Sequence, residues 1–443
     1  MVEKKNHQSG ASSEHLMAVP GIGAARSFAK AGRIAEAEAA YSEVLSSHPD
    51  NIEAIAFLAQ CLLKKGKPGE AVDAFRRACV LDPGNAQVLK NLGLACEAMG
   101  DMAGAKAAYE ASVELQPDFY QSRLHLAALY ERMGLSYQAV ANYFRAITAA
   151  QSIGQWMDAG STPPWLHDKV IHAMDVVEEG RSRLFNDCLS KLQAAFGVDE
   201  IKRVQQWLDG YLQFRSPQSA DPRQKPKFMY LPGLPSRPYY ERSLFPFIEE
   251  IESMTNAVCQ EMEASIHDSS GFVPFLGIDD PALLDGYLEN QGARPVWDAF
   301  FFYRHGSAVV ENQQKCPRTA SVLENLPLVR IREHAPEICF SVLTPGTHIL
   351  PHHGVTNTRL VLHLPLIVPA GCNLVVGGES HAWEKGRCVV FDDTYLHEAC
   401  NRGDSTRVVM IMDVWNPYLS EVERLAITEL VGVIGDFNRA AGM

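Results

Sequence analysis

The chain has 443 residues, of which 47% are hydrophobic and 21% charged, and its formal net charge is −13 (40 basic minus 53 acidic residues). That length allows two or three domains with cores of their own, and the composition is typical of an ordinary globular protein. A net negative charge repels the backbone of a nucleic acid, so a nucleic acid is not expected as the main partner.

Neither a secretory leader nor a membrane anchor is expected. Residues 1–20 are polar, and no stretch of the chain approaches 18 uninterrupted apolar residues. The ten cysteines are scattered and form no CxxC pair, a pattern typical of reduced thiols that pack as small hydrophobic side chains. These features predict a cytoplasmic protein without a membrane partner.

Residues 24 to about 150 repeat a pattern with a period of 34 residues. The markers at this spacing are a glycine (Gly32, Gly66, Gly100, Gly134), an alanine (Ala37, Ala71, Ala105, Ala139) and an aromatic residue (Tyr41, Phe75, Tyr109, Tyr143). Each unit is expected to form a helix, a glycine turn, a second helix and a break at proline. Small alanines where helices cross, with an aromatic four residues on, suit stacked helical hairpins. The pattern resembles the tetratricopeptide repeat, in about three and a half units.

The repeats predict an α-solenoid over residues 21–150, whose concave face commonly binds a peptide or a protein. In the alternative, the repeats brace the next domain or mediate dimerisation. Residues 1–20 are expected to form a disordered tail. Apolar residues at helical spacing predict a helical connector over 151–213, and a polar, proline-rich stretch predicts a linker over 214–227.

Residues 228–443 differ from the repeat region in their sequence pattern. They contain short β-rich apolar runs broken by Gly, Pro and Asn. Strands at this spacing favour a β-sandwich or a jelly roll. The last segment, "LSEVERLAITELVGVIGDF", has the apolar spacing of a helix. That helix suits either packing on its own domain or pairing with a second subunit in a homodimer.

Three features of this region fit a metal oxygenase. Candidate histidines occur in "HILPHHG" and "FDDTYLHEAC", and two imidazoles are common ligands of non-haem Fe(II). Because neighbouring side chains of a strand point to opposite faces, His352 and His353 cannot both face one metal ion. Arg407 and Ser341 lie on strand-like runs and suit the binding of a dicarboxylate. Each feature alone is a weak signal, because a single histidine on an apolar strand is more often a packed core residue.

The order of the motifs adds a resemblance to a known family. The segments "PGTHILPHHGVTNTRLVLHLPL" and "GCNLVVGGESHAWEKGRCVVFDDTYLHEACNRGDSTRVVMIMDVWNP" look like the aspartyl/asparaginyl β-hydroxylase family. The likeness covers about residues 228–420. It implies a double-stranded β-helix (jelly roll) and a dioxygenase that uses Fe(II), 2-oxoglutarate and O₂.

The resemblance also implies roles for individual residues. The iron ligands, and with them the catalytic residues, fall on His352 and His397, and Gly354 falls where related oxygenases place Asp or Glu. Arg407 matches the partner of the distal carboxylate of 2-oxoglutarate. Further cosubstrate contacts fall on Ser341 and His363, and also on Arg359, for which a structural role is the alternative. A substrate contact falls on Trp297. The substrate-binding arginine of the family does not stay in register, and the nearby Arg294 is the candidate to replace it.

A departure from the family pattern and a competing carboxylate bear on the site. Val361 stands where the animal enzyme has a second cosubstrate arginine, so the anion site is reduced. Asp393 shares a strand face with His397 and suits either a contribution to the metal site or an acceptor role that orients a histidine.

The resemblance predicts hydroxylation of an unactivated C–H bond. The leading substrate is the β-carbon of an Asp- or Asn-type residue in a peptide or protein presented by the repeats. The same mechanism on a free amino acid, a lipid or a carrier-bound metabolite is an alternative. A non-catalytic repeat scaffold with a ligand-binding barrel is an alternative of another class.

Overall fold

The computed structural model describes residues 21–215, 218–278, 286–290 and 296–443. The predicted tail (1–20) and Arg294 lie outside the described residues. The chain forms two compact units, Met1–Gly180 with Ala440–Met443, and Arg181–Arg439. The boundary at Gly180 falls within the long helix α9 (His167–Phe196). In the described ranges, no helix is long and apolar enough to cross a membrane.

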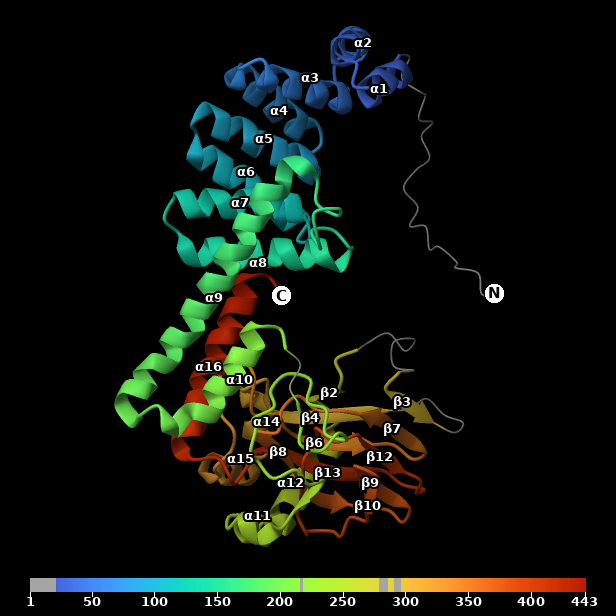
Figure 1. The fold of residues 1–443 in the computed structure, drawn as a ribbon. Coiled ribbons are helices and arrows are strands. Elements are labelled where there is room, and N and C mark those ends of the chain that lie inside the picture. Colours follow the sequence, from blue (N-terminus) through green and yellow to red (C-terminus); the bar gives the residue numbers. More distant parts are fainter. Residues whose placement is uncertain (1–20, 216–217, 279–285, 291–295) are drawn as a thin grey trace. The chain divides into compact units, whose positions relative to one another are not determined.

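The first unit is a stack of paired helices (Figure 1). Each odd-numbered helix packs against the even-numbered helix that follows it. The eight helices are α1 (Ile22–Lys30), α2 (Ile34–Ser47), α3 (Ile52–Lys64), α4 (Pro68–Leu81), α5 (Ala86–Met99), α6 (Met102–Leu115), α7 (Tyr120–Arg132) and α8 (Ser136–Ser152). A short 3₁₀ turn, Pro164–Leu166, precedes α9.

The markers of the 34-residue period have the expected structural roles. The four turn glycines have positive φ angles between 71° and 84°, which only glycine adopts without strain. The four alanines are at most 1% exposed and the four aromatic residues at most 3% exposed. At Gly93 a Cβ would lie 2.4 Å from the ring of Tyr109, so the helices approach too closely there for a side chain. The predicted repeat array is confirmed.

Two helices that follow proline-containing breaks, α3 and α5, begin at capping asparagines. The side chain of Asn51 accepts a hydrogen bond from the backbone N–H of Ala54, and that of Asn85 accepts one from Val88. Each bond satisfies a backbone donor that the first turn of a helix leaves without a partner. The sequence motifs "HPDN" and "DPGN" thus set where α3 and α5 begin.

The second unit contains two antiparallel sheets that form a jelly roll (Figure 1). The larger sheet has the order β1-β11-β8-β13-β6-β4-β2, with β5 paired to β4, and the smaller sheet has the order β10-β9-β12-β7-β3. The strands are β1 (Tyr239–Tyr240), β2 (Phe272–Pro274), β3 (Leu288–Asn290), β4 (Trp297–Arg304), β5 (Ser307–Ala308), β6 (Ile338–Leu343), β7 (Thr347–His352), β8 (Arg359–Ile367), β9 (Cys372–Val376), β10 (Glu379–His381), β11 (Val389–Phe391), β12 (His397–Asn401) and β13 (Arg407–Trp415). The predicted fold class is confirmed.

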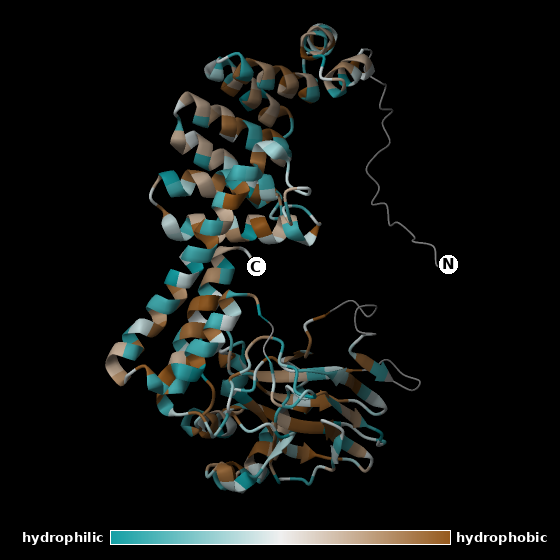
Figure 2. Ribbon diagram, in the orientation of Figure 1, coloured by the Kyte–Doolittle hydropathy of each residue, from teal (hydrophilic) through white to brown (hydrophobic). Residues whose placement is uncertain are grey.

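Both faces of the central strands are buried, and this arrangement positions the site. On β8, Leu360, Leu362 and Leu364 belong to the core that contains residues of α12, α15 and β13, whereas Val361 belongs to the core inside the barrel. Alternation along the strand therefore turns every second side chain toward the barrel interior. Figure 2 shows the strands as predominantly hydrophobic.

Helices and turns complete the second unit. They are α10 (Lys202–Leu212), α11 (Ile248–Ser253), α12 (Thr255–Asp268), α14 (Val310–Lys315), α15 (Pro317–Asn325), α16 (Glu421–Ala440) and the 3₁₀ turns Asp199–Ile201 and Arg242–Leu244. Within the second unit, Glu423 of α16 pairs with Arg203 of α10 at 2.5 Å. Pairing with a second subunit stays a prediction.

The segment predicted to be a linker makes specific contacts with the barrel. Gln224 is 2% exposed, and its Nε2 donates a hydrogen bond to Asp392 Oδ2 at 2.6 Å. The backbone N–H of Lys225 donates to the carbonyl of Thr394 at 2.8 Å. Both acceptors precede His397, so this segment supports the turn that leads into β12.

The repeat turns yield a stability prediction. Gly66 has φ +72° and open space where a Cβ would stand, so a substitution there meets backbone strain alone. We expect Gly66→Ala to destabilise the α3–α4 pair by about 1 kcal/mol, and Gly66→Asn to cost less, because Asn tolerates the left-handed conformation. Hydrogen exchange of the α3 and α4 amides measures both. Equal losses for the two variants would contradict the strain argument.

Candidate active site

The barrel encloses a cavity of about 250 Å³ between its two sheets. His352 at the end of β7 and His397 at the start of β12 are cross-strand partners, and both line the cavity. Their ring centroids are 4.1 Å apart. The pairing of β7 with β12 thus brings together two imidazoles that are 45 residues apart in the sequence.

In both imidazoles, Nε2 is the nitrogen whose lone pair is free. Nδ1 of His352 lies 2.8 Å from the carbonyl oxygen of Leu350, and Nδ1 of His397 lies 3.0 Å from that of Tyr395. A carbonyl only accepts hydrogen bonds, so Nδ1 carries the proton in each ring and Nε2 keeps its lone pair. Burial lowers the pKa of both imidazoles, that of His397 to about 3. Neutral rings oriented through Nδ1 are the form that binds a metal.

His353 points elsewhere. Its Nδ1 lies 2.8 Å from the carbonyl oxygen of Thr394, and it is not among the described residues that line the cavity. The geometry brings together His352 and His397, the pair that the family resemblance implies, and leaves His353 out.

A carboxylate fills the space beside Gly354. A Cβ at Gly354 would lie 2.1 Å from the carboxyl carbon of Asp393, so no side chain fits at that position. Asp393 Oδ2 pairs with Arg359 at 2.8 Å, and Asp393 Oδ1, although buried, has no hydrogen-bond partner among the described residues. Burial raises the pKa of Asp393, an effect that Arg359 opposes. Within the described ranges, no group of three His, Cys, Asp or Glu is placed to hold a metal ion.

The deep end of the cavity contains a buried cation. Arg407 is 1% exposed, and its Nη1 donates to the carbonyl and Oγ of Ser341 at 3.3 and 3.2 Å. No described carboxylate pairs with it, and its Nε has no partner in the described part of the chain. Burial lowers the pKa of Arg407 to about 10. A buried guanidinium without a carboxylate is costly, so this end of the cavity fits an anion.

Two more polar atoms without partners lie near this cation. Trp383 Nε1 and His363 Nδ1 are buried without hydrogen-bond partners among the described residues. The guanidinium carbon of Arg407 lies 5.0 Å from the centre of the Trp383 ring, which is 5.8 Å from the His363 ring. Sequence reasoning missed Trp383, although it is the tryptophan of the "WEKG" motif. Its contact with Arg407 depends on the tertiary fold and on no local sequence pattern.

Trp297 and Arg359 hold other residues in place. Trp297 Nε1 donates to Ser341 Oγ at 2.9 Å, and its ring stacks on Phe275 with centroids 4.0 Å apart. Arg359 pairs with Asp393 at 2.8 Å and with Asp413 at 2.5 Å. Burial lowers the pKa of Arg359, but the two carboxylates outweigh it and the net shift is upward. The predicted substrate and cosubstrate contacts of these residues stay predictions.

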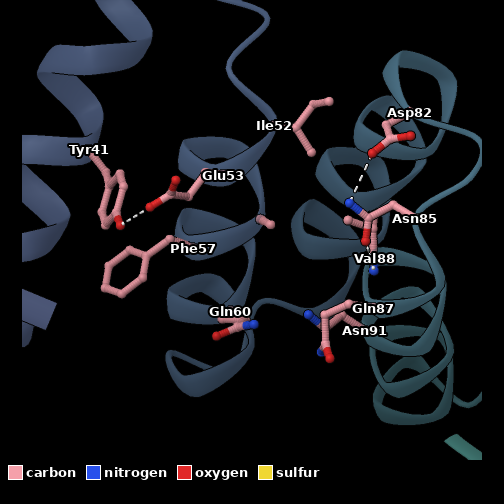
Figure 3. Close-up of a pocket in the computed structure, with 11 residues that line it drawn as sticks. Tyr41, Ile52, Glu53, Phe57, Gln60, Asp82, Asn85, Gln87, Val88 and Asn91 are labelled. Carbon is pink, nitrogen blue, oxygen red and sulfur yellow. Dashed lines mark hydrogen bonds between the residues drawn. The ribbon is translucent and has the colours of Figure 1, made fainter. Parts of the chain in front are cut away.

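The repeat unit has a cavity of its own, of about 480 Å³ (Figure 3). Its wall combines aromatic side chains with amides and carboxylates, as in Phe57, Asn91 and Glu53. The hydroxyl of Tyr41 donates to Glu53 at 2.7 Å. Such a mixed surface on a helical solenoid suits an extended polypeptide, which presents both backbone amides and apolar side chains.

The fold and the site define a repeat protein that also contains a jelly roll with a paired-histidine cavity. Residues 257–417 match the family model described as Aspartyl/Asparaginyl beta-hydroxylase. Residues 22–86 and 86–119 match models of the tetratricopeptide repeat. The chain therefore carries an aspartyl/asparaginyl β-hydroxylase domain together with tetratricopeptide repeats, which confirms both resemblances.

Curated relatives resemble the barrel region. "Aspartate beta-hydroxylase domain-containing protein 2" of Rattus norvegicus is 37% identical over 208 residues, which are 46% of this chain and 58% of the relative. "Aspartate beta-hydroxylase domain-containing protein 1" of Mus musculus is 33% identical over 208 residues, 46% of this chain and 55% of the relative. The match thus spans little more than half the length of these relatives.

Two further matches cover a smaller share of this chain. "Aspartyl/asparaginyl beta-hydroxylase" of Homo sapiens is 34% identical over 143 residues, 31% of this chain and 18% of the relative. Among solved structures, "Crystal structure of MamA protein" is 22% identical and covers 39% of this chain and 91% of the other, with a TM-score of 0.27. A likeness at that score carries no argument.

The imidazole pair yields a metal-binding prediction. We expect His352→Ala to abolish the binding of Co(II), used in place of Fe(II), because the ligand that supplies a free Nε2 is lost. His353→Ala removes a residue outside the cavity and should weaken binding by less than about tenfold, the lower end for groups around a metal site. Isothermal titration calorimetry measures both. Equal loss in the two variants would contradict the assignment.

The anion end yields a second prediction. With Co(II) present, we expect Arg407→Gln to weaken 2-oxoglutarate binding about 10- to 150-fold, the range for a lost charged hydrogen bond. Trp383→Phe keeps the ring but removes the N–H, and should weaken binding about 2- to 12-fold. Trp165→Phe, at a side chain that is 79% exposed in the other unit, is the control. Unchanged affinity in Trp383→Phe would show that the indole does not reach the cosubstrate.

Proposed function

We propose that the protein is a hydroxylase that depends on Fe(II) and 2-oxoglutarate and uses O₂. The observation that carries the proposal is one cavity with two kinds of group at its ends. Two neutral imidazoles with free Nε2 atoms stand at one end, and a buried arginine without a carboxylate stands at the other. A metal chelated by a dicarboxylate satisfies both ends at once.

The residues present fit these groups. His352 and His397 would hold Fe(II) through Nε2, and Arg407 would pair with the distal carboxylate of 2-oxoglutarate, assisted by Ser341 and Trp383. When bound, the iron would supply the activation of O₂ that inserts oxygen into an unactivated C–H bond, while 2-oxoglutarate yields succinate and CO₂.

The chain's own residues would orient the reactants and exclude water. Trp297 holds Ser341, and Ser341 accepts a hydrogen bond from Arg407, so the anion end is preorganised before the cosubstrate arrives. Asp393 keeps one carboxylate oxygen free beside the imidazoles. Its negative charge would offset part of the charge of a divalent cation that only two neutral side chains bind.

The substrate and the partner of the repeats belong to the same proposal. The family points to the β-carbon of an Asp- or Asn-type residue in a peptide or protein, and the repeat cavity would bind the polypeptide that carries it. A free amino acid, a lipid or a carrier-bound metabolite is the alternative substrate. A cytoplasmic location also stays a proposal.

Succinate formation tests the activity. We expect the full chain with Fe(II) and 2-oxoglutarate to release succinate, slowly without a primary substrate and faster with one. His397→Ala should reduce release to background, because one of two protein ligands is lost, and His353→Ala should retain it. If the wild-type chain binds Co(II) and 2-oxoglutarate but releases no succinate under any condition, the non-catalytic scaffold with a ligand-binding barrel would be favoured instead.

A further inference from the structure

One segment of the second unit crosses both of the turns that adjoin the paired imidazoles. This segment, residues 219–231, is here called the strap, and it precedes β1. The first ligand turn, residues 353–357, follows His352, and the second ligand turn, residues 392–396, precedes His397. The orientation of the two imidazoles therefore depends on how these turns are held.

Backbone hydrogen bonds join the strap to both turns. The N–H of Lys225 donates to the carbonyl of Thr394, in the second ligand turn, at 2.8 Å. The N–H of Lys227 donates to the carbonyl of Gly354, in the first ligand turn, at 3.1 Å. The turns also bond to each other, because the N–H of Gly354 donates to the carbonyl of Asp393 at 2.6 Å. Three segments thus share one backbone network.

Gln224 places a buried amide within this network. Its Oε1 accepts hydrogen bonds from the hydroxyls of Ser219 at 3.0 Å and Ser236 at 2.9 Å. Its Nε2 donates to Asp392 Oδ2 at 2.6 Å. An ionised carboxylate only accepts hydrogen bonds, so the amide has a single orientation in which both of its ends are satisfied.

The other oxygen of Asp392 sets the shape of the second ligand turn. Asp392 Oδ1 accepts from the backbone N–H of Thr394 at 2.9 Å and from its hydroxyl at 2.5 Å, which is the pattern of an Asx turn. Burial raises the pKa of Asp392 to about 7, and the donors on Thr394 and Gln224 oppose that rise. Removal of a donor from a buried carboxylate is costly, so the turn depends on the amide of the strap.

Tyr395 connects the second ligand turn to His397. Its carbonyl oxygen lies 3.0 Å from Nδ1 of His397 and so orients that imidazole. The strap holds its side chain, because its hydroxyl donates to Asp221 Oδ2 at 3.0 Å and the guanidinium of Arg223 lies 5.5 Å from the centre of its ring. The group that accepts from Nδ1 of a ligating histidine fixes the direction of its Nε2.

We propose that Gln224 is a positioning residue for the metal site. Through Asp392 and the second ligand turn, its amide fixes the direction in which His397 presents Nε2, and hence the geometry of a bound metal. Gln224 is not among the described residues that line the cavity, so it acts through other residues. This inference rests on the proposed function and adds a residue on which the geometry of its metal site depends.

Binding of Co(II) to the full chain tests this role. Gln224→Glu sets a second carboxylate against Asp392, and we expect the Co(II) affinity, measured by calorimetry, to fall about 10- to 100-fold, the range for groups around a metal site. The visible absorption of Co(II), which reports its coordination geometry, should change as well. Gln224→Met keeps most of the side-chain volume without the charge, and should weaken binding about 2- to 12-fold. It carries the test if the charged variant does not fold.

A paired exchange separates positioning from packing. In the double variant Gln224→Glu/Asp392→Asn, the donor and the acceptor exchange places across the same hydrogen bond. The introduced carboxylate can still accept from the two serine hydroxyls, and the oxygen of the introduced amide can still accept from Thr394. We expect the Co(II) affinity to exceed that of Gln224→Glu by about tenfold or more, within the range of coupling for bonded pairs, and the absorption to return to that of the wild type.

Gln218→Glu is the matched control, because it introduces the same charge at an exposed position just before the strap. It should leave the Co(II) affinity and absorption unchanged, and a loss equal to that of Gln224→Glu would trace the effect to charge alone and contradict the proposal. Wild-type behaviour of both Gln224→Glu and Gln224→Met would overturn the positioning role. A double variant that recovers neither affinity nor absorption would overturn it too.

These outcomes are separable from that of the proposed function. Normal Co(II) binding by the wild type and by both Gln224 variants overturns the positioning role alone. Absence of Co(II) binding by the wild type overturns the metal site and, with it, both proposals. The expected Co(II) results without succinate formation would overturn the hydroxylase and leave the positioning role in place.

Discussion

The buried guanidinium of Arg359 is the contact on which the mouth of the barrel depends. It stands at the start of β8 and pairs with Asp393, which precedes β12, and with Asp413, near the end of β13. Three segments that are distant in sequence meet at one cation. Loss of one partner from such a buried group typically costs about 3–5 kcal/mol, because it leaves a charge uncompensated. The same cation holds Asp393 beside the imidazoles.

The chemistry of the site follows from how hydrogen bonds are distributed over its two ends. At the imidazole end, main-chain carbonyls accept from Nδ1 of His352 and His397 and leave both Nε2 atoms available. At the deep end, Arg407 and Trp383 are buried with donors that no described group accepts. An interior normally satisfies its polar atoms, so unpaired atoms in and beside the cavity indicate the groups that a ligand must bring.

The site also explains why two histidines and a glycine can stand where three ligands are usual. The space that a side chain at Gly354 would need contains the Asp393 carboxylate, which comes from the neighbouring turn and is held by Arg359. Negative charge is thus still present at this position, but on a carboxylate that an arginine restrains. Under the proposed function, this arrangement would leave more of the coordination sphere of a bound metal to the cosubstrate and to small molecules.

The sequence by itself determined the repeat array, because turn glycines, buried alanines and aromatic residues recur with one local period. It also determined which histidines and which arginine to consider, because alternation along a strand and the order of motifs are local properties. Tertiary structure alone decided the contacts that join distant strands. Trp383 reaches Arg407, Asp393 fills the space at Gly354, and Arg359 bridges two carboxylates. Each depends on strand register or helix docking between residues tens of positions apart, which no local pattern encodes.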